Sequence, residues 1–194
     1  MRFAPNPAGA QHLGNARPAV LCDEYARKYK GKFILRYDDT DPKVKVPEKQ
    51  YYKWIREDLA WLKIRVHETV MASKRLGVYY KYAEKLLKED HAYVCTCNKE
   101  SWKKLITQSK ACPCRALAPS NQMRRWKKMF SGYREGEVVM RIKTELDAKN
   151  PAVRDWPAFR IVEEPKHFVK KKVWPLYNFA SAIDDHLLGV THIF

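Results

Sequence analysis

The chain has 194 residues, and 45% of them are hydrophobic, which is enough to bury a sizeable core and excludes a disordered protein. No apolar run approaches the roughly 20 residues that span a bilayer, and the N-terminus lacks the apolar segment of a signal peptide, so we expect a cytoplasmic protein. The formal net charge of +16 favours a polyanionic partner such as nucleic acid, although a solvated basic surface would give the same count.

The first sixteen residues combine the end of a strand, a loop and the start of a helix. Two prolines and a glycine stop regular pairing after Phe3, and apolar residues then recur at helical spacing from Leu21 to Tyr29. Gly14 would let the backbone lie close to a ligand, and free N–H groups at a helix start favour phosphate. The pattern predicts a nucleotide site that includes His12, whose alternative role is a hydrogen-bonded residue at a helix N-terminus.

A buried strand is predicted over Phe33–Tyr37, with Asp38, Asp39 and Asp41 at its C-terminal end, where open α/β sheets bind their ligands. The alternative for these aspartates, Asp39 and Asp41 above all, is a turn and a helix cap. Helices are predicted over Pro47–Leu62 and Tyr79–Asp90. This βαβ-like alternation predicts, over residues 1–92, the first half of a Rossmann-like, doubly wound parallel sheet.

Four of the five cysteines form two C-x-C pairs, Cys95 with Cys97 and Cys112 with Cys114, and 14 residues separate the pairs. Four thiolates in two close pairs suit tetrahedral zinc, whereas a reducing compartment disfavours disulfides. The alternative is ordinary thiols, and Cys22, on the apolar stripe of the first helix, is expected in the core.

The sequence pattern changes at Tyr93. Short helices are predicted around Trp102–Ile106 and Met123–Phe130, strands at Val138–Lys143 and Ala158–Val162, and a hairpin at Lys166–Lys172. We therefore expect a separate α+β module over residues 93–173. Residues 174–194 follow it, and their last apolar run, Val190–Phe194, is typical of a strand.

Positive charge is concentrated in this module, because residues 93–173 hold 19 basic and 8 acidic side chains. Lys and Arg neutralise backbone phosphates without reading base sequence, so the module is the expected nucleic-acid surface. Four aromatic residues are interleaved with the charges: Trp102, Trp126, Tyr133 and Trp156. The candidate phosphate contacts are Arg124, Arg125, Lys127 and Lys128.

Several of these motifs resemble one known family. The segments Arg2–Gly9 and His12–Arg17 resemble the "RFAPSPTG…HIGH" signature of class I glutamyl- and glutaminyl-tRNA synthetases, and Phe33–Asp41 resembles their "FILRIEDTD". Further stretches are similar to "VVMRIK", "NPAVRDW" and "YNFA…DDHLLGVTH" of the archaeal and eukaryotic-type glutamyl enzymes: Val138–Lys143, Asn150–Trp156 and Tyr177–His192. The matches span nearly the whole chain.

The resemblance implies an α/β class I aminoacyl-tRNA synthetase fold, in which residues 93–173 are an inserted tRNA acceptor-binding module with zinc and residues 174–194 begin the second half of the nucleotide fold. It implies ligation of glutamate to tRNA through a glutamyl adenylate, with ATP and Mg²⁺, in a monomer with no membrane partner. Two alternatives are a non-catalytic acceptor-stem binding module and the glutaminyl enzyme.

The same resemblance implies roles for individual residues. His12, Gly14 and Asn15 would contact ATP, and Asn15 stands where the family has a second histidine, so charge stabilisation there is expected to be weaker. The residues expected to contact substrate are Arg2, Asn6, Asp38, Tyr177 and Asp185. No segment resembles the family's "KMSKS" loop or its anticodon-binding region, so we expect a truncated catalytic region that activates glutamate poorly by itself.

Overall fold

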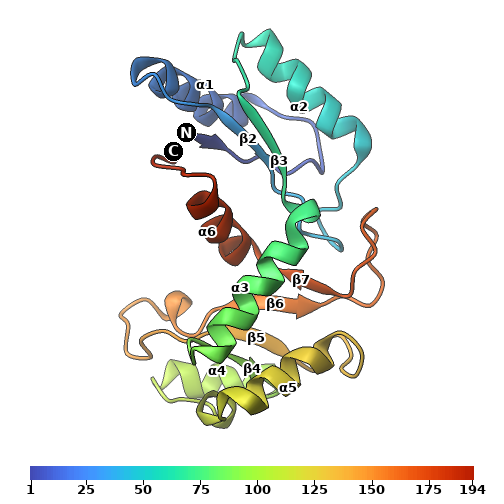
Figure 1. Cartoon of the computed structure of the whole chain (residues 1–194), viewed down its shortest axis with the longest axis vertical. Coiled ribbons are helices and arrows are strands. Elements are labelled where there is room, and N and C mark those ends of the chain that lie inside the picture. Colours follow the sequence, from blue (N-terminus) through green and yellow to red (C-terminus); the bar gives the residue numbers. More distant parts are fainter. The chain divides into compact units, whose positions relative to one another are not determined.

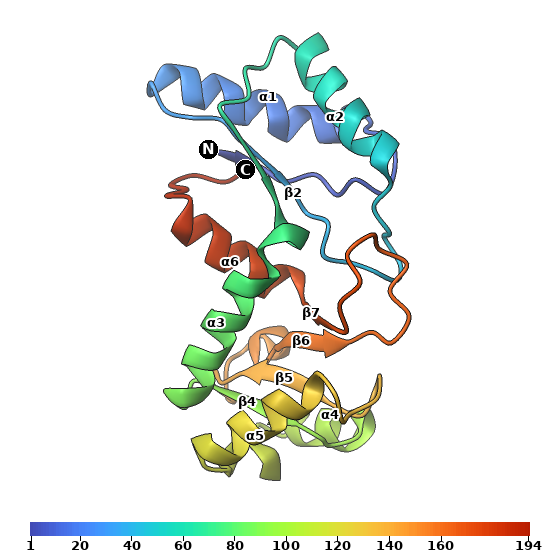
Figure 2. The same cartoon turned by 45° about the vertical axis from the view of Figure 1, so that its right-hand side comes forward.

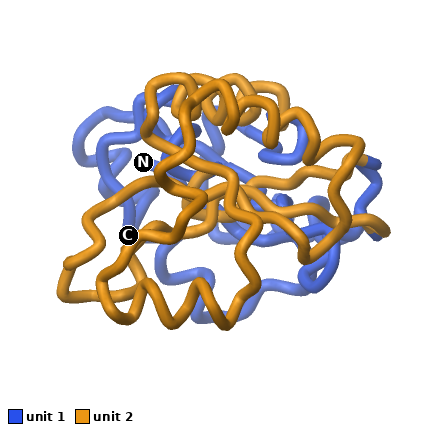
Figure 3. The backbone as a smooth tube through the Cα atoms, turned by 90° about the horizontal axis from the view of Figure 1, so that it is seen from below, with its two compact units in different colours: residues 1–75, 166–170, 180–194 blue, residues 76–165, 171–179 orange.

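The computed structural model describes all residues from 1 to 194, and they form two compact units (Figure 3). The first unit comprises residues 1–75, 166–170 and 180–194, and the second comprises residues 76–165 and 171–179. Each unit contains one β-sheet, parallel in the first and antiparallel in the second.

The first unit is an α/β unit whose three strands are parallel in the order β1-β2-β3. These strands are β1 (Arg2–Phe3), β2 (Ile34–Tyr37) and β3 (Glu68–Met71), with the connecting helices α1 (Leu13–Lys28) and α2 (Lys49–Trp61) and the short helix η1 (Ala72–Arg75). Helices α1 and α2 lie on the same side of the sheet (Figures 1 and 2). The expected class, α/β with a parallel sheet, is confirmed. The sequence did not predict β3, because Val70 is its only fully buried residue.

Side-chain alternation gives this sheet two different faces. Phe3 pairs with Leu35 in the register, and both pack with Cys22 and Ile55 in the apolar core under α1 and α2. Arg2 and Arg36 point to the opposite face, since successive side chains of a strand alternate. The strands therefore bury apolar residues on one side and present two arginines on the other.

Helix α1 buries a narrower stripe than its sequence predicts. Ala19, Cys22 and Ala26 are buried, whereas Tyr25 and Tyr29 expose 36% and 60% of their surface. The small side chains let α1 approach the sheet closely, and the two tyrosines are left at the margin of the contact, where their rings stack 6.0 Å apart. Cys22 is a core residue, as expected.

The second unit is built on an antiparallel sheet of order β4-β5-β6-β7. Its strands are β4 (Ala92–Cys95), β5 (Val139–Ile142), β6 (Pro157–Ile161) and β7 (Val173–Pro175). Its helices are α3 (Leu76–Lys88), α4 (Lys99–Thr107), η2 (Pro113–Ala116), α5 (Pro119–Met129) and η3 (Pro151–Val153), and α6 (Tyr177–Leu187) begins here and continues into the first unit. The helices and strands predicted between residues 99 and 162 are confirmed.

Trp126 lies in the core of the second unit and not on an outer surface. It exposes 1% of its surface, and its ring packs edge-on against Tyr80, Phe130 and Phe159. The interleaving of aromatic and basic residues around Trp126 therefore arises because α5 is amphipathic, with apolar residues facing the sheet and basic residues facing solvent.

Two local predictions are wrong. Lys166–Lys172 is not a hairpin but part of the loop that joins β6 to β7, since strand pairing ends at Ile161 and Val173. Val190–Phe194 forms no strand, because Gly189, at φ +62°, ends α6 and the Val190 N–H bonds back to the Asp185 carbonyl. In addition, none of the helices combines the length and apolar character that crossing a membrane requires.

Candidate functional site

Arg2, at the start of β1, forms a two-point ion pair with Asp185 of α6. Its Nε donates to Oδ1 at 2.9 Å, and its Nη2 donates to Oδ2 at 2.7 Å. Paired N–H···O bonds of this kind are among the strongest and best oriented contacts between a guanidinium and a carboxylate. The two side chains expose 7% and 17%, so water screens the pair weakly. The guanidinium fork predicted to bind a substrate carboxylate therefore holds Asp185.

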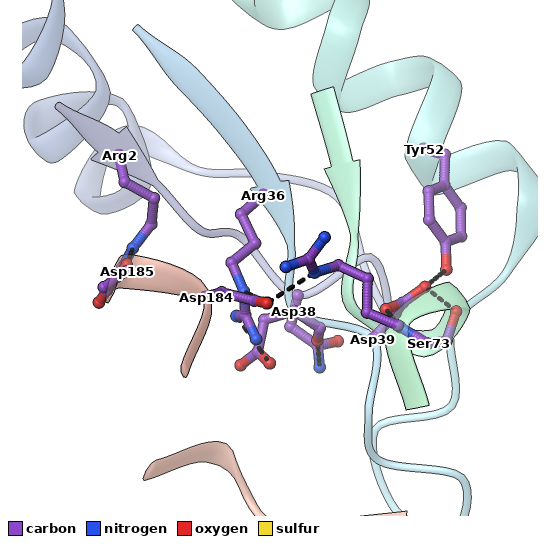
Figure 4. Close-up of polar contacts among 10 residues, drawn as sticks. Arg2, Arg36, Asp38, Asp39, Tyr52, Ser73, Asp184 and Asp185 are labelled. Carbon is purple, nitrogen blue, oxygen red and sulfur yellow. Dashed lines mark hydrogen bonds and ion pairs between the residues drawn. The ribbon is translucent and has the colours of Figure 1, made fainter. Parts of the chain in front are cut away.

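The preceding residue, Asp184, forms a second and more deeply buried ion pair (Figure 4). One of its oxygens accepts from Arg36 Nε at 2.7 Å and the other accepts from Arg75 Nε at 2.7 Å. Asp184 and Arg36 are fully buried. A buried carboxylate is stable only when cations neutralise it and donors satisfy its oxygens, and here both conditions hold. Asp184 thus ties α6 to β2 and to the end of η1.

Asp38 directly follows β2 and carries the carboxylate predicted to bind an ammonium group. Burial raises the pKa of this carboxyl, and the Arg36 guanidinium, 3.4 Å away, opposes the shift without cancelling it. Asn6 Nδ2 donates to the Asp38 carbonyl at 2.8 Å, while Asn6 Oδ1 is buried with no partner. Since an orphaned buried acceptor is costly, a ligand N–H would be stabilised at this oxygen.

Asp39 and Asp41 have structural roles, and Asp41 has the predicted turn role, whereas Asp39 forms long-range hydrogen bonds instead of a turn. Asp39 accepts from Ser73 N and Oγ at 2.7 Å each and from Tyr52 Oη at 2.6 Å, so it joins the ends of β2 and β3 to α2 (Figure 4). Asp41 accepts the backbone N–H groups two and three residues later, at 3.0 and 3.1 Å.

His12 caps the N-terminus of α1. Its Nδ1 accepts the Gly14 N–H at 3.1 Å, so a neutral imidazole carries its proton on Nε2, and the side chain is exposed. A Cβ at Gly14 would lie 2.8 Å from His12 Cε1, so this glycine is needed for the close approach of the His12 ring. The Asn15 N–H bonds to the His12 carbonyl at 2.8 Å. The three residues expected to contact ATP therefore form one helix start.

A groove of about 280 Å³ runs beside this helix start and is bounded on its far side by α2. His12 and Asn15 line this groove. Its apolar wall includes Leu59 and the exposed side chains of Leu13 and Trp61. A mainly apolar wall of this kind is better suited to a ring or an aliphatic group than to a phosphate.

Tyr177, which was predicted to line the substrate side chain, is the first residue of α6 and exposes half of its surface. It belongs to the second unit, whereas Arg2, Asn6, Asp38 and Asp185 belong to the first.

The four cysteines of the C-x-C pairs converge at the end of β4 and the start of η2. Their sulfurs all lie within 4.8 Å of one another, with Cys95 and Cys112 3.8 Å apart and Cys97 and Cys114 also 3.8 Å apart. Four sulfurs at about 2.3 Å from a tetrahedral zinc ion are separated by about 3.8 Å. The geometry and chemistry of the donors therefore fit a zinc ion, and no disulfide joins them.

The surroundings of the cysteine cluster favour negative charge on two of the four sulfurs. Hydrogen bonding with Cys112 and burial raise the pKa of Cys95, and burial raises the pKa of Cys97. Hydrogen bonding with the Cys95 thiol and with the Tyr93 hydroxyl lowers the pKa of Cys112 to about 5. Burial opposes ionisation of Cys114, but hydrogen bonds from Thr96 and the Arg125 guanidinium outweigh it and lower the pKa of that thiol. A thiolate is the form that binds metal, and Cys112 and Cys114 are the two sulfurs whose surroundings favour that form.

The four basic residues expected to contact phosphate differ in their surroundings, although all lie on α5. Arg125 Nη1 donates to the Val94 carbonyl at 3.0 Å, so this residue supports β4. Arg124 bonds to Asn121 within the helix, Lys127 is exposed, and Lys128 lies over the Tyr133 ring at 4.7 Å. Three of the four therefore remain available to a polyanion.

Sequence reasoning did not single out Arg36, Arg75 or Asp184. The signal was present for Arg36, since an arginine inside an otherwise apolar strand requires a buried partner. The identity of that partner, 148 residues away, follows only from the fold.

Comparison with known proteins identifies the family of the chain. The family model "tRNA synthetases class I (E and Q), catalytic domain" matches residues 1–194. The glutamate–tRNA ligases of Pyrococcus furiosus and Thermococcus kodakarensis are 64% and 62% identical to the chain, and each alignment covers 100% of the chain and 34% of the relative. The chain thus spans about a third of the length of these curated relatives.

A crystal structure of a glutamate tRNA ligase from Elizabethkingia meningosepticum, in complex with its amino acid, has a similar fold, with a TM-score of 0.69 at 23% identity. The match covers 98% of this chain and 42% of that one. The family model, which covers every residue, places the chain in the class I tRNA synthetases for glutamate and glutamine, as a member of their catalytic-domain family.

Proposed function

We propose that the protein is a glutamate–tRNA ligase, and that this chain carries the part of it that binds glutamate and ATP and contacts the tRNA acceptor stem. The observation that carries the proposal is the 61–64% identity, over the whole chain, to three curated relatives named glutamate–tRNA ligase. Such an enzyme joins the glutamate carboxylate to the α-phosphate of ATP, with release of pyrophosphate, and then transfers the glutamyl group to a ribose hydroxyl of tRNA, with release of AMP.

The end of β2 is proposed to hold the α-ammonium of glutamate. Asp38 supplies a carboxylate, and Asn6 Oδ1, an acceptor without a donor, supplies a second oxygen. A carboxylate of the substrate would compete with Asp185 for the fork of Arg2. The reaction needs no protein nucleophile, so the main contribution of these residues is orientation and charge stabilisation.

The start of α1 is proposed to bind the phosphates of ATP, supplied as its Mg²⁺ complex. His12 has its Nε2–H as a donor because Nδ1 is engaged by Gly14. Asn15, three residues further, offers an amide donor without positive charge. Free backbone N–H groups and the helix dipole at this terminus favour the same anion.

Residues 93–173 are proposed to form the acceptor-stem module, with Cys95, Cys97, Cys112 and Cys114 holding one structural zinc ion. These four sulfurs would hold the ion at the end of β4 and the start of η2, where it would have a structural role, since protein thiolates would supply all of its ligands. Arg124, Lys127 and Lys128 supply the phosphate contacts, and Tyr177 remains a predicted substrate contact.

Glutamate-dependent exchange between ATP and pyrophosphate tests this proposal directly. The protein is assayed at the length that its gene encodes, with and without tRNA, and with glutamine in a parallel reaction. We expect exchange with glutamate and little with glutamine. Exchange with glutamine alone would indicate the glutaminyl enzyme, and tRNA binding without any exchange would indicate a non-catalytic acceptor-stem binding module.

A further inference from the structure

A cavity of about 560 Å³ opens on the first unit, beside the N-terminal half of α2, and none of the residues expected to hold glutamate or ATP lines it. Its cationic wall comes from α2 and η1, and its floor comes from β2, β3 and the segment 166–170. Every lining residue belongs to the first unit.

Four cations surround this cavity: Lys49, Lys53 and Arg56 on successive turns of α2, and Lys74 on η1. Lys53 lies 3.5 Å from Glu57, whereas the other three form no ion pair. Basic side chains that converge on a concavity without carboxylates raise the local potential and attract anions.

Aromatic rings form the rest of the wall, and internal contacts hold them in place. Tyr37 Oη donates to the Tyr52 carbonyl at 2.9 Å, and Tyr52 Oη donates to the buried Asp39 carboxylate at 2.6 Å. Phe168 packs edge-on against Tyr52 at 6.2 Å and still exposes 44% of its surface. The Lys166 N–H bonds to the Pro42 carbonyl at 2.9 Å, which anchors the segment that carries Phe168.

We propose that this cavity binds an unpaired nucleotide segment of RNA, with its phosphates on Lys49, Arg56 and Lys74 and one base stacked on Phe168. Proteins bind single-stranded nucleic acid with this combination, a cationic groove that follows the backbone and an aromatic ring that accepts any base. The negative charge of phosphate matches the three unpaired cations. A base can stack on the part of the Phe168 ring that is not covered by the His167 ring, whose centroid lies 4.1 Å away. The inference rests on the proposed function only in taking tRNA as the source of the strand.

The test is ultraviolet crosslinking of the chain to a single-stranded RNA octamer that contains 4-thiouridine, followed by peptide mapping. To remove the competing surface on α5, the experiment is run on wild type and in the R124Q/K127Q/K128Q background. We expect a crosslink in the peptide that contains Phe168 or in residues 49–56, and Phe168→Ala should weaken octamer binding at least about fivefold, because the stacking ring is removed.

The variant K49Q/R56Q/K74Q should reduce the slope of log affinity against log salt by about 2, since each phosphate contact to a single strand contributes about 0.7. The matched control is K81Q/K85Q/K88Q, which removes the same charge from the exposed face of α3 and should leave the slope within about 0.3. Equal slopes for the two variants, or crosslinks confined to other peptides, would overturn the proposal.

Inorganic pyrophosphate distinguishes RNA from a small anion. If pyrophosphate blocks the crosslink at no higher concentration than unlabelled octamer does, the cavity is a small-anion site and the RNA assignment fails. The result is also separable from the proposed ligase function: glutamate-dependent exchange without a crosslink here refutes only this inference, and a crosslink here without exchange refutes only the ligase.

Discussion

Arg2 and Asp185 are 183 positions apart in the sequence, yet two hydrogen bonds of 2.9 and 2.7 Å join them. The pair connects the first strand of the chain to α6 on the face of the parallel sheet opposite to the core that Phe3 and Leu35 share with Cys22 and Ile55. It also means that a carboxylate of the protein already occupies the guanidinium that a substrate carboxylate would use.

Replacing Asp185 by asparagine should therefore have two opposite effects. The free energy of unfolding should fall by about 1–3 kcal/mol, because a buried guanidinium loses its counter-charge. Glutamate should bind more tightly, because a neutral amide competes less strongly than a carboxylate for the Arg2 fork. Urea unfolding and calorimetric titration measure the two effects. Unchanged glutamate affinity would contradict the assignment of Arg2 as a carboxylate ligand, and Arg2→Lys, which lacks the fork, is the control.

Glutamate affinity should decrease as the pH is lowered. The decrease should begin at a higher pH than it would if Asp38 had the pKa of an ordinary aspartate. Only ionised Asp38 attracts an ammonium group, and burial raises the pKa of Asp38 above its usual 3.8, so binding is present above the raised pKa and is lost as pH falls through it. Titrations between about pH 4 and 7 should show this loss. Asp38→Asn should bind weakly and without that pH dependence, and an identical profile for the variant would refute the role.

Two substitutions at His12 separate its capping role from its proposed contact with ATP. Asparagine is a good N-cap, so His12→Asn should leave thermal stability nearly unchanged, whereas His12→Ala should cost about 1 kcal/mol. Both should lower ATP–pyrophosphate exchange by about a hundredfold, since a donor to the phosphates is removed. Exchange that survives in His12→Asn would restrict His12 to a structural role.

One zinc ion per chain is expected from the four converging cysteines. The double variant C95S/C112S should lose the metal and loosen the end of β4, which hydrogen exchange would detect in residues 92–98. Metal analysis of tag-free protein should give about one zinc in wild type. Well under one zinc, with four titratable thiols, would refute the site.

The affinity for acceptor-stem RNA should fall steeply as the salt concentration rises, because basic side chains of α5 contact its phosphates. R124Q/K127Q/K128Q should reduce the slope by about 0.7–0.9 for each side chain that no longer neutralises a phosphate. Arg125→Gln should act differently, lowering stability and metal affinity rather than the slope, because Arg125 supports the Val94 carbonyl and the Cys114 thiolate. If Arg125→Gln reduced the slope as much as each substitution in R124Q/K127Q/K128Q does, Arg125 would be a phosphate contact like the other three.

Local patterns predicted the elements of the fold well, because helix stripes such as Ile55 and Leu59 and the apolar strand ending at Tyr37 depend on near neighbours in the sequence. Short strands were missed where burial is provided by distant segments, as in β3 and in β7. In the site, His12, Asp38 and the cysteines were recognisable as residue types, and the structure adds their hydrogen-bond partners. The pairing of Arg2 with Asp185 was not predicted. Each residue was assigned to a substrate contact, and a pairing across 183 positions follows only from the fold.

The buried pairing of Arg36 with Asp184 also orders the events of biosynthesis. Arg36 leaves the ribosome 148 residues before its carboxylate partner, which at about 5–20 residues per second is a delay of roughly 7 to 30 s. During that time the arginine face of the nascent sheet has no counter-charge from α6 and stays in contact with water. The neighbouring Asp38 carboxylate, 3.4 Å from Arg36 in the finished fold, is synthesised with the sheet, and synthesis of α6 then supplies the second, fully buried counter-charge.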